Sequence, residues 1–344
     1  MAMRCSLALA LASVLSLGAA EIVDAQDLRQ LFRNVSPSVA VIRAKGQDVT
    51  AAGRVTFGET GSGVLISPDG KVMTAAHVVH TMDTITVEFL GGETVRAHVI
   101  ASEPAADLSL LQLERVPSTA RVAKLADSNT VAVGEQVIVV GAPYGLSYAM
   151  SVGWISARWP ANTVYKSMPL ADFFQTTATI NQGNSGGPMF NMAGQVIGIV
   201  SHNISKSGGS EGLGFVVTIN TAKKLLLEQP SFWSGLEGRL LDNQLADLLN
   251  LPPKALGYLV TTVAKGSPGE ALGLRGGTKV AVINGESIVV GGDIILKVQG
   301  IAVGGLETYE KIRDELRQLA PGATLTITIL RTGEIKDLSA PMRR

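Results

Sequence analysis

The spacing of apolar residues between positions 38 and 217 predicts a β-rich architecture. Short apolar or alternating runs are separated by Gly, Pro, Asp and Asn, and Pro68-Asp69-Gly70 is one clear turn signal. No long amphipathic helix alternates with these runs. Many short strands at this spacing favour an all-β barrel or sandwich pair over a parallel α/β sheet. The clearest runs are residues 39–43, 63–66, 84–89, 136–140 and 195–200.

The pattern changes after residue 220, which indicates a second domain. A helical pattern over 307–319, with acidic residues in its first turn, precedes a period-two strand pattern over 324–330. The length of 344 residues also favours two domains, because single cores stop growing near about 250–300 residues. We expect a leader at 1–25, one domain at 26–228 and a smaller α+β domain at 229–344.

The leader has the features of a secretory signal peptide. Arg4 precedes an uncharged stretch over 6–20, which is shorter than the roughly 20 apolar residues that span a bilayer. Cleavage after Ala25 or Ala20 fits, and it would remove Cys5, the only cysteine. We therefore expect an exported protein, located in the periplasm, with no stable membrane span and no disulfide. An uncleaved leader that anchors the chain to the membrane is the alternative.

Composition excludes some classes of function. The chain has 29 Lys+Arg and 29 Asp+Glu, so its formal charge of zero gives no electrostatic basis for binding nucleic acid. Only 17% of residues are charged, while Gly accounts for 38 of 344. This composition fits a globular β-rich protein with many tight turns, and neither a disordered chain nor a coiled coil.

The strongest chemical signal is residues 183–188, Gly-Asn-Ser-Gly-Gly-Pro. A serine hydroxyl is a poor nucleophile until a base removes its proton. His77 follows a run of small residues at the end of a strand pattern, and Asp107 begins an apolar stretch. The order His77, Asp107, Ser185 is the chain order of a chymotrypsin-type catalytic triad. These three residues therefore predict a serine hydrolase.

Three motifs carry a resemblance to a known family. Residues 74–77 (Thr-Ala-Ala-His), 107–111 (Asp-Leu-Ser-Leu-Leu) and 183–188 resemble the catalytic motifs of HtrA/Deg-type trypsin-like serine proteases. Ala142 and Thr177 depart from the residues usual in that family, but neither belongs to the triad. The resemblance implies a mostly β fold: a chymotrypsin-like double β-barrel followed by a PDZ domain. Supporting matches lie at 61–64, 141–145 and 212–215.

The resemblance and the chemistry together assign roles. Ser185 would attack the scissile carbonyl, His77 would act as base and then acid, and Asp107 would orient the imidazole. An oxyanion hole is expected at Gly183, Asn184 and Ser185, where the glycine permits a sharp turn.

The resemblance also predicts where substrate binds. The strand that pairs with the substrate backbone would contain Ser201, His202 and Asn203. Thr179, six residues before the nucleophile, would lie at the base of the main specificity pocket. Because it is not an acid, we expect small or medium aliphatic side chains there.

The C-terminal region resembles the PDZ domain of the same proteases over residues 257–268, 271–274 and 292–295, with an insert at 276–290. PDZ domains bind a peptide's C-terminal carboxylate through backbone N–H groups and add the peptide to a strand edge. The predicted peptide-binding residues are Ser234, Gly235 and Leu236 in the carboxylate loop, with Tyr309 and Ile312 on the facing helix.

These observations favour an exported serine endopeptidase of misfolded or unfolded proteins, with C-terminal peptides as further partners. The alternatives are a site-specific signalling protease and a peptide-binding chaperone or scaffold. The apolar stripe within residues 27–37 indicates a homotrimer, in line with the resemblance, or packing on the chain's own barrel. We expect no cofactor and no catalytic metal, since neither a His-Glu-x-x-His motif nor a cysteine cluster occurs. His80 and His98 are interpreted as residues without a catalytic role.

Overall fold

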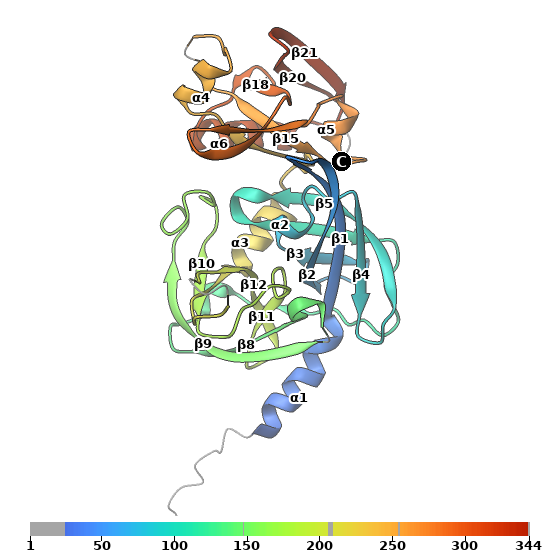
Figure 1. Ribbon diagram of the computed structural model, residues 1–344. Coiled ribbons are helices and arrows are strands. Elements are labelled where there is room, and N and C mark those ends of the chain that lie inside the picture. Colours follow the sequence, from blue (N-terminus) through green and yellow to red (C-terminus); the bar gives the residue numbers. More distant parts are fainter. Residues whose placement is uncertain (1–24, 147, 206–208, 254, 343–344) are drawn as a thin grey trace, which may run out of the picture.

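The computed structural model describes residues 25–146, 148–205, 209–253 and 255–342 (Figure 1). Its first part is a closed antiparallel barrel of order β1-β2-β3-β6-β5-β4. Alternate residues of β4 point inward, so that Ile85, Val87 and Phe89 are buried, as the period-two pattern requires. The strands are β1 (Val39–Thr50), β2 (Gly53–Leu65), β3 (Lys71–Thr74), β4 (Thr84–Phe89), β5 (Thr94–Glu103) and β6 (Leu108–Leu113).

The second barrel follows in the order β11-β8-β9-β10-β13-β12 and closes because β11 also pairs with β12. Phe173, Phe174 and Phe190 are among its fully buried side chains. The expected double β-barrel is confirmed, and residues 214–218 form its last strand. The barrel strands are β8 (Gln136–Gly141), β9 (Ala149–Trp159), β10 (Phe173–Thr176), β11 (Pro188–Asn191), β12 (Gln195–Asn203) and β13 (Gly214–Thr218), and the short β7 (Lys124–Leu125) pairs with β12.

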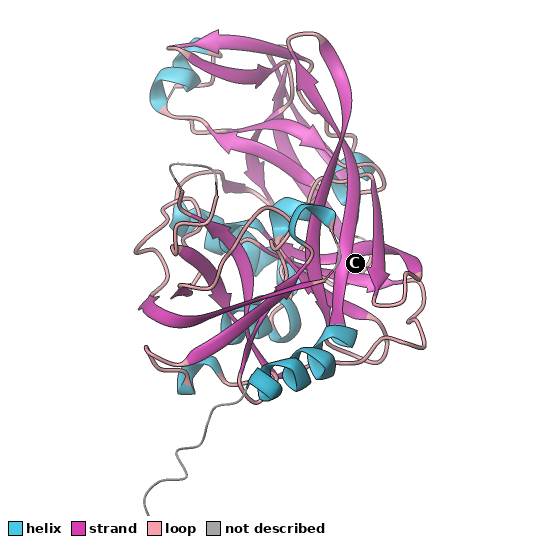
Figure 2. Cartoon of the chain, turned by 60° about the horizontal axis from the view of Figure 1, so that its bottom comes forward, coloured by secondary structure: helices cyan, strands magenta, loops and turns pink. Residues whose placement is uncertain are grey.

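The expected apolar stripe lies on helix α1 (Ala25–Val35), which Figure 2 shows beneath the barrels. Leu31 and Val35 are only 8% and 5% exposed because they pack into a core cluster that also contains residues of both barrels. Of the two alternatives for this stripe, packing on the chain's own barrels is the arrangement observed. The predicted leader lies almost wholly outside the described residues. In the described part of the chain no helix is long and apolar enough to cross a bilayer.

A short helix, α3 (Ile219–Lys223), and a π-helical turn lead to a C-terminal unit with its own sheet, of order β14-β15-β18-β20-β21. The predicted insert forms a separate hairpin, β16 (Lys279–Ile283) with β17 (Glu286–Val290). The remaining elements are β14 (Leu236–Leu240), α4 (Asn243–Leu248), β15 (Tyr258–Val263), α5 (Pro268–Ala271), β18 (Ile294–Val298), β19 (Ile301–Ala302), α6 (Leu306–Gln318), β20 (Thr324–Arg331) and β21 (Glu334–Pro341).

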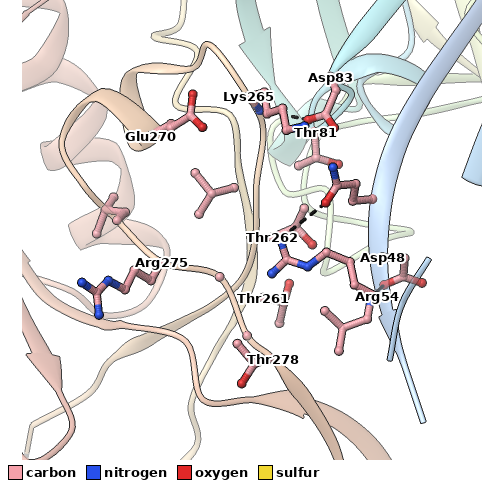
Figure 3. A pocket seen from close by; sticks show the side chains of 16 residues that line it. Asp48, Arg54, Thr81, Asp83, Thr261, Thr262, Lys265, Glu270, Arg275 and Thr278 are labelled. Atoms are coloured by element: carbon pink, nitrogen blue, oxygen red, sulfur yellow. Dashed lines mark hydrogen bonds between the residues drawn. The ribbon is translucent and has the colours of Figure 1, made fainter. Parts of the chain in front are cut away.

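The C-terminal unit packs against the first barrel through polar contacts. The tip of the β1–β2 hairpin and a loop of the C-terminal unit border a polar cavity of about 350 Å³, whose lining includes Asp48 and Arg54 on one side and Lys265 and Arg275 on the other (Figure 3). The Lys265 N–H donates to Asp83 at 3.0 Å across this junction. The two units therefore have a defined relative placement, and further contacts lie close to the catalytic residues.

Candidate active site

The first barrel supplies the histidine and the acid. His77 lies in helix α2 (Ala76–Val79), directly after β3, and Asp107 follows the turn Pro104–Ala106. Asp107 adopts a left-handed conformation, φ 53°, while its N–H donates to Pro104 at 3.0 Å. This turn aims the carboxylate at His77, whose Nδ1 lies 2.9 Å and 3.0 Å from its two oxygens.

Asp107 is almost completely buried, at 7% exposure. Burial by itself would raise the pKa of this carboxyl, but hydrogen bonds from the His77 ring, the His77 N–H and the Ser201 hydroxyl outweigh burial and hold the pKa below its ordinary value. The residue is therefore an anion at neutral pH and acts only as an acceptor.

That anion governs the charge state of His77. Burial would lower the pKa of the imidazole, but the hydrogen bond to Asp107 and its negative charge raise the pKa above the ordinary 6.5. Because Asp107 binds Nδ1, the proton of neutral His77 sits on Nδ1 and the lone pair is on Nε2. This is the tautomer that a general base needs.

The second barrel supplies Ser185, on the loop between β10 and β11. Ser62 of β2 fixes this loop to the first barrel, since its N–H donates to the Ser185 carbonyl at 2.8 Å. The Ser185 hydroxyl donates to the Ser201 carbonyl at 3.2 Å, and in the described part of the chain it makes no hydrogen bond to His77. The hydroxyl must therefore turn toward Nε2 before it can be deprotonated.

Two backbone donors beside Ser185 are free. The Gln182 carbonyl accepts from the Tyr144 N–H at 2.8 Å, so the N–H of the same trans peptide, that of Gly183, points the other way. Within the described residues, neither this N–H nor that of Ser185 donates to another group. Asn184 does not fit as a third donor, because its N–H is bonded to Asn181 at 3.0 Å. The free pair has the character of an oxyanion hole.

Gly183 is required at its position. Its φ is +97°, and a Cβ there would lie 2.3 Å from the Ala142 carbonyl oxygen. A side chain would therefore both strain this turn and collide with the neighbouring loop.

The predicted substrate-binding residues lie where the strand reasoning put them, but their role stays a prediction. Ser201, His202 and Asn203 end strand β12 beside the triad. Thr179 is exposed, and its backbone carbonyl accepts a hydrogen bond from the side-chain Nδ2 of Asn184 at 3.4 Å.

The predicted peptide-binding residues of the C-terminal unit come together around one large, mostly apolar cavity of about 600 Å³. Ser234, Leu236, Tyr309 and Ile312 line it, and Gly235, with φ +68°, turns the chain into β14. Their assignment as a peptide groove stays a prediction.

Residues of the first barrel also line this cavity, among them His80 and Glu103, to which sequence reasoning gave no role. His80, three residues after His77, is bonded through Nε2 to the Leu236 carbonyl at 2.9 Å. Glu103, four residues before Asp107, is fully buried and accepts hydrogen bonds from Tyr309 and Ser231. Their nearness in sequence to the triad was the one available signal, but their partners lie more than a hundred residues away. His98, by contrast, is exposed on β5, as expected.

A double β-barrel with this constellation defines the trypsin-like class of serine peptidases, and the family comparison agrees: residues 61–199 match the trypsin-like peptidase domain. Two curated relatives are named probable periplasmic serine endoprotease DegP-like. The one from Pseudomonas savastanoi pv. phaseolicola is 33% identical over 78% of this chain and 55% of its own length. The one from Rhizobium meliloti is 30% identical over 94% of this chain and 61% of its own length.

Solved structures point the same way. A variant of the HtrA-type protease AlgW with a decapeptide has a TM-score of 0.55 and 25% identity, over 91% of this chain and 96% of its own. AlgW with a tripeptide has a TM-score of 0.52 and 26% identity, over 91% and 95%. The chain thus contains a trypsin-like peptidase domain and is similar to HtrA/Deg-type serine proteases. It spans between 48% and 61% of the length of curated relatives of this kind.

Proposed function

We propose that this chain is an exported serine endopeptidase that hydrolyses peptide bonds in unfolded or misfolded proteins, using His77, Asp107 and Ser185. The observation that carries the proposal is the buried Asp107 carboxylate bonded to His77 beside a serine loop with two free N–H donors. A turn without catalytic function would need neither the buried anion nor the unoccupied donors.

Catalysis would begin with proton transfer from Ser185 to Nε2 of His77 as the hydroxyl attacks the scissile carbonyl. The N–H groups of Gly183 and Ser185 would stabilise the negative charge that develops on the carbonyl oxygen. His77 would then give its proton to the leaving amine, which leaves an acyl group on Ser185. A water molecule would release this group with His77 again as the base, and Asp107 would stabilise the imidazolium at each stage.

Substrate would bind along the end of β12, with its backbone paired to Ser201 and Asn203. The absence of an acid at Thr179 supports a preference for small or medium aliphatic side chains. In the resting arrangement the Ser201 carbonyl is occupied by the Ser185 hydroxyl. A substrate N–H that takes over this carbonyl would free the hydroxyl to turn toward His77.

The C-terminal unit would bind peptide C-termini as a PDZ domain, between β14 and α6. A specific observation favours the second candidate, a protease whose cleavage of chosen substrates is regulated by such peptides. Leu236 and Tyr309, on the two sides of the predicted groove, contact His80 and Glu103, which flank the catalytic pair in sequence. Peptide binding in the groove would therefore alter the contacts of the segments that carry His77 and Asp107.

Assembly and location follow the family. A homotrimer, in the periplasm or held at the membrane by an uncleaved leader, is the expected form. Light scattering of the purified protein measures the assembly, and a monomeric mass would contradict it. Sequencing the mature N-terminus tells a cleaved leader from a retained one.

The proposed activity is tested by casein hydrolysis. Wild-type protein should degrade unfolded casein, and the Ser185→Ala variant should not. Deleting the residues after 230 should weaken casein cleavage more than cleavage of a short peptide if the C-terminal unit gathers substrates. Equal loss of both activities would indicate the regulated protease. Casein hydrolysis that persists in the Ser185→Ala variant would refute the assignment of the nucleophile.

A further inference from the structure

Ser201 contacts two members of the triad because it is the extra residue of a β-bulge. Val200 pairs with Val216 and His202 pairs with Phe215, which leaves Ser201 without an opposite residue on β13. Its carbonyl accepts the Ser185 hydroxyl, and its own hydroxyl is bonded to Asp107. The orientation of the Ser201 side chain therefore directly determines one hydrogen bond of Asp107.

The hydrogen bonds of Ser201 fix the tautomer of His202. The Ser201 Oγ also lies 2.9 Å from Nδ1 of His202. A hydroxyl has one proton, and Asp107 is an ionised acceptor, so the proton of Ser201 goes to Asp107. The contact to His202 then needs a proton on Nδ1. The result is a directed chain from the His202 N–H through the Ser201 O–H to Asp107, which already binds His77.

Aromatic packing holds the His202 ring in place for this bond. The ring stacks on Phe215 with 5.4 Å between centroids and 10° between planes, and Tyr165 meets it edge-on at 4.3 Å. In the described part of the chain Nε2 is buried without a hydrogen-bond partner. A ring that served packing alone would do so better without this unsatisfied nitrogen. Among the described residues, the ring's hydrogen bond is to Ser201.

We propose that His202 is a positioning residue for the triad: its Nδ1–H holds the Ser201 hydroxyl in the orientation that points the proton at Asp107. This inference rests on the proposed protease function. Donation to the hydroxyl also polarises it, which strengthens its own bond to the carboxylate. Asp107 is thereby held in one orientation, and with it the Nδ1–H tautomer of His77.

The pH profile gives a readout that packing alone would not move. The titratable groups around the ring are Asp107, His77 and Tyr165. Burial lowers the pKa of His202, so the ring is neutral while the enzyme works. Loss of its N–H weakens the Ser201 bond to Asp107, so the carboxylate interacts more strongly with His77. The pKa of His77 then rises, and the acid limb of kcat/KM moves to higher pH.

Two substitutions separate positioning from packing. His202→Phe keeps the stack on Phe215 and removes the N–H, whereas His202→Asn keeps a donor near the position of Nδ1 and removes the ring. On a peptide that the wild-type enzyme cleaves, we expect His202→Phe to lower kcat by about three- to tenfold, the effect of one ordinary hydrogen bond. KM should stay unchanged, and His202→Asn should recover most of the rate. His98→Phe, at an exposed histidine, is the control.

Other outcomes overturn the proposal. A fully active His202→Phe enzyme beside an impaired His202→Asn enzyme would assign the ring to packing. A rise in KM at unchanged kcat would make His202 a substrate contact. A wild-type protein that cleaves no peptide would count against the proposed function. The tautomer of His202 can then still be tested without any activity. In ¹⁵N-histidine-labelled Ser185→Ala protein, nitrogen NMR should find the proton of His202 on Nδ1, and a proton on Nε2 would contradict the inference.

Discussion

The Nε2 atom of His80 lies 2.9 Å from the carbonyl oxygen of Leu236, and this contact joins the catalytic segment to the first strand of the C-terminal unit. Nδ1 of the same ring lies 2.7 Å from the Ser102 hydroxyl. The Trp233 indole N–H adds a bond to the His80 carbonyl at 2.8 Å. His80 is therefore a fixed, buried part of the junction between the two units.

This buried histidine should make stability depend on pH. Burial lowers the pKa of His80 from 6.5 to about 4. The unfolded chain therefore binds a proton below pH 6.5, while the folded protein does not until about pH 4. The resulting loss of stability grows as pH falls through this range and reaches roughly 3 kcal/mol. The non-titrating His80→Gln variant should lose less stability than wild type between pH 6.5 and 4, measured by urea unfolding. His98→Gln should behave like wild type, and identical pH profiles for His80→Gln and wild type would contradict the contribution of His80.

The buried Glu103 carboxylate gives a second prediction. It accepts hydrogen bonds from Tyr309 and Ser231 of the C-terminal region and from the Ala105 N–H of its own barrel, so both units contribute to its solvation. Tyr309→Phe removes one donor and leaves the carboxylate under-solvated, which should cost about 1–3 kcal/mol of unfolding free energy. Tyr144→Phe, at an exposed tyrosine, is the matched control and should change stability little. Equal stability of Tyr309→Phe and wild type would show that this hydrogen bond contributes nothing to the junction.

Gly183 permits a test of the oxyanion hole. Gly183→Ala should lower kcat by about a hundred- to a thousandfold, because the displaced turn no longer presents its N–H to the carbonyl oxygen. Gly134→Ala introduces a methyl group at nearly the same φ, +95°, with no atom within 4 Å of its Cβ. It measures the cost of the backbone strain alone. Similar activity of the two variants would argue against a special role for Gly183.

The pH dependence of catalysis should follow His77. Since Asp107 raises the pKa of His77 above 6.5, kcat/KM should fall as the pH decreases, with a midpoint above pH 6.5. A chelator such as EDTA should leave this profile unchanged, because side chains and backbone N–H groups fill every role in the proposed mechanism. Inhibition by EDTA that added zinc or calcium reverses would contradict the mechanism.

Local patterns were sufficient to predict the strands and an all-β barrel or sandwich pair, because alternation along a strand records burial residue by residue. The double β-barrel was predicted from the family resemblance. They also led to His77 and Asp107, which the structure brings into contact. The roles of His80 and Glu103 could not be predicted, since each depends on a partner more than a hundred residues away in the C-terminal unit. The sequence left two alternatives for the α1 stripe for a similar reason: its 3–4 spacing indicates burial, and not which surface buries it.

Covalent labelling tests the central claim most directly. An aryl phosphonofluoridate, which reacts with activated serines by loss of fluoride, should add one phosphonyl group per chain, located on Ser185 by peptide mass spectrometry. His77→Ala should abolish this reaction, and Asp107→Asn should slow it by up to about ten-thousandfold, because the wrong imidazole tautomer would face the hydroxyl. Modification at another serine, or labelling of Ser185 that proceeds equally fast without His77, would contradict a nucleophile activated by this histidine and acid.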